Sequence, residues 1–125
     1  MVSANSTSVS VLAGSAIPWQ NGNFTACDRS NSNSTTITLG RCGLYSIDFD
    51  GSVSTAAADS SISLTLFVNG VATTIGTLVA TTAADSPVAA SFNTVLRVSS
   101  LPTTISVVSD SEITVNKAQI KAVRL

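Results

Sequence analysis

The clearest pattern along the chain is an alternation of apolar and polar residues within Gly43–Asp50. The apolar positions are Tyr45, Ile47 and Phe49, and the polar positions are Ser46, Asp48 and Asp50. A period of two residues places all the apolar side chains on one face of an extended segment. One buried face and one solvated face are typical of an antiparallel sheet, so this segment is predicted to be such a strand.

The next segment predicts a β-hairpin that turns at Asn69 and Gly70. Asn-Gly favours the two-residue type I′ turn, because both central residues of that turn take a positive φ. The cross-strand pairs that then share one face are Val68 with Val71, Leu66 with Thr73, and Leu64 with Ile75. The turn residues and the hydrophobic pattern therefore predict the same strand register.

Shorter patterns predict further strands, again from alternation. One strand begins at Val9, a second spans Thr36–Leu39, and a third includes Phe92–Val98. A fourth spans Thr103–Ser109, and the last runs from Glu112 to Leu125. In the last one the apolar parity switches after Val115, and a β-bulge near Asn116 and Lys117 would account for the switch. The residues expected in the core are Tyr45, Ile47, Phe49, Leu64, Leu66, Phe92 and Leu96.

The remaining segments are polar or rich in small residues. We expect residues 1–8 to be an arm without structure of its own, and Asn21–Ser34 to be a long loop. Gly51–Ser61 and Thr81–Pro87 are predicted connections. No segment has a helical period behind a helix cap. The pattern predicts an all-β protein in which residues 9–125 form a single antiparallel β-sandwich or jelly roll.

Composition narrows the function classes. Charged residues are only 10% of the chain, and the net charge is -1, so no basic surface for nucleic acid is expected. No apolar run approaches the roughly 18 residues of a membrane span. Histidine, the commonest general base and metal ligand, is absent. We therefore expect no enzyme activity, no catalytic residues, no cofactor and no membrane or nucleic-acid partner.

Three carboxylates are the strongest candidates for chemistry. Asp48 and Asp50 lie about 7 Å apart on one strand face, whereas a glycosidase needs two carboxylates across a cleft. Together with Asp59 they could hold Ca²⁺ through oxygen ligands. The alternative is a solvated outer face, and since nothing else in the sequence converges there, no metal site is predicted.

Two cysteines and two aromatic residues are the other candidates. Cys27 and Cys42 are either a disulfide between neighbouring strands, formed outside a reducing cytosol, or two small buried hydrophobes. Trp19 and Phe24 are the candidate interface residues. Packing in the core is the alternative for Trp19, and anchoring of the surrounding loop is the alternative for Phe24.

Three segments resemble motifs of the C1q/TNF-like jelly-roll domains. Thr36–Leu39 followed by Gly43–Phe49 resembles the family's "tl…pGiYeisf" core, and Leu64–Val71 resembles its "l.L.vNGv" hairpin. Ile113–Ile120 resembles its closing "tvnnasl.v.kl" strand. The resemblance covers residues 36–125. It is nearest to the C-terminal domains of exosporium collagen-like glycoproteins and to short stand-alone virion proteins of tailed phages.

Two departures from the family pattern are visible. No Gly-X-Y collagen stem precedes the domain, which favours the stand-alone phage form, and Ser99–Pro102 replaces the usual apolar turn. The N-terminus has neither the basic nor the apolar segment of a signal peptide.

The resemblance implies a homotrimer. It also implies a structural virion protein on the capsid surface, made in the host cytoplasm, that decorates (cements) the capsid or forms a head fibre. Its partner would be the major capsid protein or another virion protein. The alternative is a receptor- or glycan-binding module of a phage fibre or a bacterial surface appendage.

Overall fold

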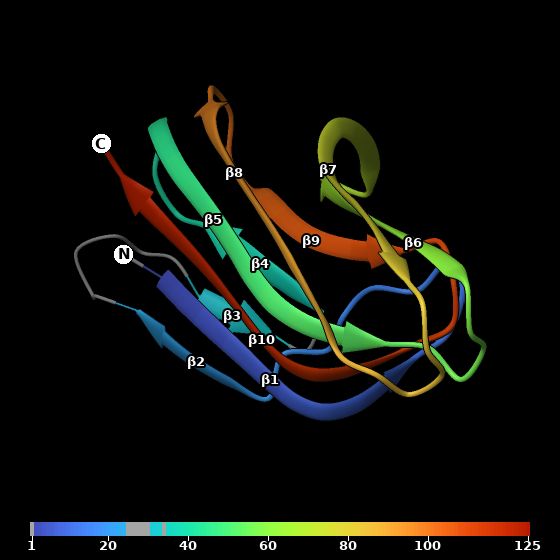
Figure 1. Cartoon of the computed structure of the whole chain (residues 1–125). Helices are drawn as coiled ribbons and strands as arrows, with labels where there is room; N and C mark the ends of the chain where they lie inside the picture. Colours follow the sequence, from blue (N-terminus) through green and yellow to red (C-terminus); the bar gives the residue numbers. More distant parts are fainter. Residues whose placement is uncertain (1, 25–30, 34) are drawn as a thin grey trace.

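Two five-stranded antiparallel sheets pack face to face in the computed structural model, which describes residues 2–24, 31–33 and 35–125 (Figure 1). The first sheet has the order β2 (Asn21–Phe24), β1 (Val2–Val11), β10 (Ile113–Arg124), β5 (Gly43–Ser54) and β8 (Val88–Val98). The second has the order β3 (Asn31–Asn33), β4 (Thr36–Leu39), β9 (Thr103–Ser109), β6 (Ser60–Val68) and β7 (Val71–Thr81). Among the described residues no helix is long and apolar enough to cross a membrane.

Alternation explains why the central strands form where they do. β5 contains the predicted Gly43–Asp50 strand but continues to Ser54, which shortens the expected connection to five residues, 55–59. The predicted β-bulge is confirmed, because the pairing of β10 with β5 shifts register between Val115 and Lys117. Val115 before the shift and Ala118 after it are both buried, so the bulge keeps the apolar side chains of both halves inside.

The N-terminal segment corrects one expectation. Residues 1–8 were predicted to be a free arm, yet β1 pairs with β10 on one side and with β2 on the other. Ala4 and Ser6 point inward and are 2% and 0% exposed. The strand has the period of two residues, but its inward side chains are too small to produce a visible hydrophobic pattern.

The prediction that Asn21–Ser34 forms a long loop is also wrong in part. Residues 21–24 and 31–33 are strands, which pair with β1 and β4 through the main chain. Just before β2, the Gln20 side chain continues the pairing with β1. Its amide oxygen accepts a hydrogen bond from Thr7 N at 3.1 Å, and its Nε2 donates to Thr7 O at 3.0 Å. Main-chain pairing of this kind does not depend on apolar side chains, so a polar sequence does not exclude it.

The predicted turn of the β6–β7 hairpin is confirmed. Asn69 and Gly70 have φ values of 52° and 79°, and Val68 pairs with Val71. Asn69 also joins this turn to the start of β9, because its Oδ1 accepts a hydrogen bond from Thr104 N and its own N donates to Thr104 O.

Beyond the turn the predicted register is wrong. After Phe67 pairs with Ala72, pairing resumes only at Thr65 with Gly76, so the predicted pairs Leu66–Thr73 and Leu64–Ile75 do not form. Thr73 bridges the irregularity, since its Oγ1 donates to Leu66 O at 2.6 Å and accepts from Ile75 N at 3.2 Å. Gly76 permits the close return of the strand, because a Cβ at this position would collide with Leu64 O.

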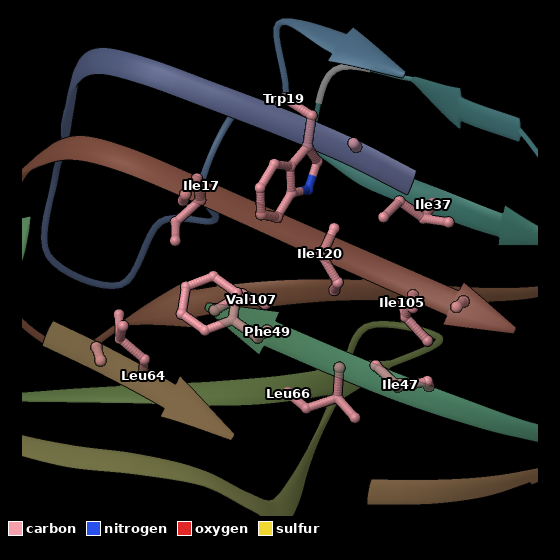
Figure 2. Close-up of a cluster of buried hydrophobic side chains, with 14 of the residues drawn as sticks. Ile17, Trp19, Ile37, Ile47, Phe49, Leu64, Leu66, Ile105, Val107 and Ile120 are labelled. Carbon is pink, nitrogen blue, oxygen red and sulfur yellow. The ribbon is translucent and has the colours of Figure 1, made fainter. Parts of the chain in front are cut away.

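The core lies between the sheets and centres on Phe49, which is 2% exposed (Figure 2). The edge of the Trp19 ring faces it, with centroids 6.4 Å apart, and Phe92 stacks on it at 5.2 Å. Five of the seven expected core residues are buried, namely Tyr45, Ile47, Phe49, Leu64 and Leu66. Phe92 and Leu96 are only half-buried, because β8 is an edge strand and no further strand covers its outer side.

Phe49→Ala should lower the free energy of unfolding by about 3–5 kcal/mol, through lost burial and the cavity that remains. Leu12→Ala is the control, because Leu12 is 64% exposed in the turn after β1 and its truncation should change stability by no more than about 0.5 kcal/mol. Urea unfolding of both variants measures the difference. Equal losses would contradict the central position of Phe49.

Gly70→Val should cost about 1–2 kcal/mol, because it places a β-branched side chain at a positive φ. Ala72→Val introduces the same side chain two residues later, at an exposed strand position, and should be close to neutral. Thermal unfolding of the pair tests this. A Gly70→Val melting temperature equal to that of the unchanged protein would show that the turn does not need glycine.

Candidate functional site

Trp19 lies in the core. It is 6% exposed and packs against Phe49, and Figure 2 shows the two rings pointing toward each other from different parts of the chain. Trp19 therefore packs in the core, which was the alternative to a role at an interface. An indole buried to this depth has almost no surface for contact with a partner. Its Nε1 and the Ser6 hydroxyl are buried without a hydrogen-bond partner.

The other sequence candidates are placed only in part. Phe24 is the last residue of β2, and its side chain lies outside the description. Cys27 lies outside the described residues, so its pairing with Cys42 stays a prediction. Cys42 itself is exposed at the loop before β5. The alternative of a small buried hydrophobe is therefore wrong for this cysteine.

The three candidate carboxylates are exposed and are not brought together. Asp48 and Asp50 project from the outer face of β5, where their cross-strand neighbours on β10 are Lys121 and Gln119. Asp59 stands in the loop between β5 and β6. Within the described part of the chain, no three Asp, Glu, Cys or His side chains lie close enough to hold a metal ion.

The most unusual surface is the long side of the sandwich where β7 and β8 lie in contact, called here the β7–β8 edge. Each strand ends its sheet, so each presents unpaired main-chain groups. Both strands also carry exposed apolar side chains: Val71 and Leu78 of β7 are 69% and 73% exposed, and Val95 of β8 is 58% exposed. Edge strands of monomers usually carry charges or prolines that prevent pairing with other chains. β7 contains neither, and β8 has one charged residue, Arg97 near its end.

Charge is sorted between the two ends of the sandwich. The described acidic residues outside β5 all lie in the turns at one end, toward the lower right of Figure 1. They are Asp59, Asp85, Asp110 and Glu112. The described arginines all lie at the other end, where β5 begins and β8 and β10 finish, namely Arg41, Arg97 and Arg124. The two ends therefore present opposite charges to a partner.

Sequence reasoning missed both of these surfaces. The lack of charge on β7 has a visible signal, because no charged residue occurs from Ser60 to Ala84. The separation of acidic and basic residues between the two ends has no visible signal in the linear sequence. Residues as distant as Arg41 and Arg124 meet at one end only because β5 and β10 are neighbouring antiparallel strands.

Comparison with known proteins supports the architecture. No family model and no curated protein matches the chain. Among solved structures, the globular domain of zebrafish complement 1qA protein superposes with a TM-score of 0.71 at 11% identity, over 99% of this chain and 95% of that one. The Eiger TNF from S. frugiperda gives 0.68 at 13% identity, over 98% and 91% of the two chains.

The fold is the C1q/TNF-like jelly roll. A viral protein shares it as well. The PRD1 vertex protein P5 superposes with a TM-score of 0.60 at 16% identity, over 99% of this chain and 95% of that one. A jelly roll of this kind thus accounts for the whole described chain, and the likeness at these identities concerns the fold alone.

Proposed function

We propose that this C1q/TNF-like jelly roll is a non-enzymatic structural protein of a tailed-phage virion. In this proposal it acts as a trimer that decorates the capsid or forms a head fibre. The observation that carries the proposal is the charge-poor β7–β8 edge. Leu78 and Val95 are exposed there on the outer faces of the two sheets, and the inward-facing Phe92 and Leu96 stay half-buried. The fold shared with the PRD1 vertex protein supports a place in a virion.

The β7–β8 edge is suited to contact with another copy of the chain. Burial of β7 and the adjoining part of β8 would remove apolar side chains from water without stranding a charge, because the single charged residue of these strands, Arg97, lies near the end of β8. With a net charge of -1, little repulsion opposes such contact. Behind the exposed residues stand the half-buried Ile75, Val79, Phe92 and Leu96, which a neighbour would cover further.

Attachment to the capsid falls to the ends of the sandwich. The N-terminal segment is built into the first sheet as β1, so it is not free to reach a neighbouring protein. The turns at either end project instead, and they carry charges that fix an orientation. A trimer that docks at a threefold position engages three such ends at once, and this multiplies weak contacts into stable attachment.

Light scattering coupled to size exclusion should give the mass of three 12.7-kDa chains. Leu78→Asp should shift this mass to that of one chain, because the carboxylate would be buried without a partner. Leu12→Asp is the matched control, since Leu12 is 64% exposed in the turn after β1 and away from the edge. A clean monomer of the unchanged protein at micromolar concentration would overturn the trimer. A trimeric Leu78→Asp variant would show that the trimer forms through another surface.

Capsids that lack the protein should lose resistance to heat or to low salt, because a cement protein contributes to capsid stability only while bound. The measurement is the release of packaged genome with temperature, compared with capsids to which the purified protein has been added back. Capsids of unchanged robustness that fail to adsorb to cells would replace this role with the receptor-binding alternative.

A further inference from the structure

Two arginines share one open hollow at the basic end of the sandwich. The hollow has a volume of about 410 Å³ and is lined by Gly40, Arg41, Cys42, Leu101 and Arg124. None of the described Asp or Glu residues lies at this end. Arg41 and Arg124 therefore contribute two positive charges to the same space without a carboxylate side chain to balance them.

Arg124 is held in place by the chain segment that it crosses. Its Nε donates a hydrogen bond to Cys42 O at 3.0 Å. Its guanidinium also lies over Gly43, where a Cβ would stand 3.1 Å from Nε. Gly43 has a φ of 136°, so a larger residue is disfavoured by backbone conformation as well as by space. The hydrogen bond uses only Nε and leaves the paired N–H groups at the end of the guanidinium for a ligand.

The loop that carries Arg41 is anchored to the core. The Tyr45 hydroxyl donates to Arg41 O at 2.8 Å, and the Tyr45 side chain is 1% exposed. Just after Arg124, Leu125 N donates to Leu44 O at 2.8 Å and keeps the end of β10 against β5. Both arginines thus project from main chain that is already ordered, which lowers the entropic cost of binding a ligand.

We propose that this hollow binds a phosphate group, either as free phosphate or as a phosphomonoester carried by a partner. The guanidinium is planar and presents parallel N–H donors that match phosphate oxygens. Two such groups balance the charge of a dianion, whereas a carboxylate carries a single negative charge. The proposal is independent of the trimer and of the capsid role, because one chain supplies every residue of the hollow.

The test is a titration of the full chain, labelled with ¹⁵N, with sodium phosphate at pH 7.5 and constant ionic strength. The Nε–H signal of Arg124 and the amide signals of Arg41 and Cys42 should shift and saturate, with a dissociation constant on the order of 1 mM. Glycerol phosphate should bind with similar affinity, and acetate should bind at least about tenfold more weakly because it carries one charge. Shifts that do not saturate, or equal binding of acetate and phosphate, would overturn the proposal.

Two variants separate a site from a general effect of charge. Arg41→Gln should weaken phosphate binding about tenfold, through the loss of charge-assisted hydrogen bonds. Arg97→Gln makes the same change in charge at the same end, but Arg97 lines a different hollow with Gly43 and Leu44. It should leave the affinity within about twofold. If both variants weakened phosphate binding equally, phosphate would be attracted only by the overall positive charge of this end and not by a specific site.

Discussion

The burial of Phe49 between the two sheets is the interaction on which the rest of the sandwich depends. Phe49 belongs to the first sheet, and its ring occupies the space between the layers (Figure 2). Trp19 closes this space from the segment after β1, and Phe92 stacks on the ring from β8. The three rings join parts of the chain that no shared turn connects. Because aromatic burial contributes so much apolar area, loss of this contact would loosen both sheets at once.

The parts of the fold that the sequence predicts well are those with large apolar side chains at every second position. The strand around Tyr45 and the bulge in β10 belong to this group, whereas the turn at Asn69 is predicted by the Asn-Gly pair itself. β1 escapes prediction because Ala4 and Ser6 fill its inward face, and β2 and β3 escape because main-chain pairing leaves no hydrophobic signature. The register of β7 depends on one hydroxyl, that of Thr73, which competes with the main-chain pairing.

The two candidate surfaces also differ in how far the sequence predicts them. A charge-poor edge can be recognised in the sequence once β7 and β8 are known to be edge strands. The hollow at the basic end cannot, because it combines residues more than 80 positions apart through the pairing of β10 with β5. Side-to-side contact through a charge-poor edge and end-on contact through charged turns use different parts of the surface. One small domain can therefore take part in both kinds of contact at the same time.

The place of β10 within the first sheet has a consequence for how the protein is made. β10 lies between β1 and β5, and it pairs with each of them along most of its length. Until residue 124 has left the ribosome, β1 and β5 have no partner on their facing sides, and the first sheet cannot close. The first sheet can therefore form only after β10 has been synthesised, and the nascent chain carries two open strand edges until then.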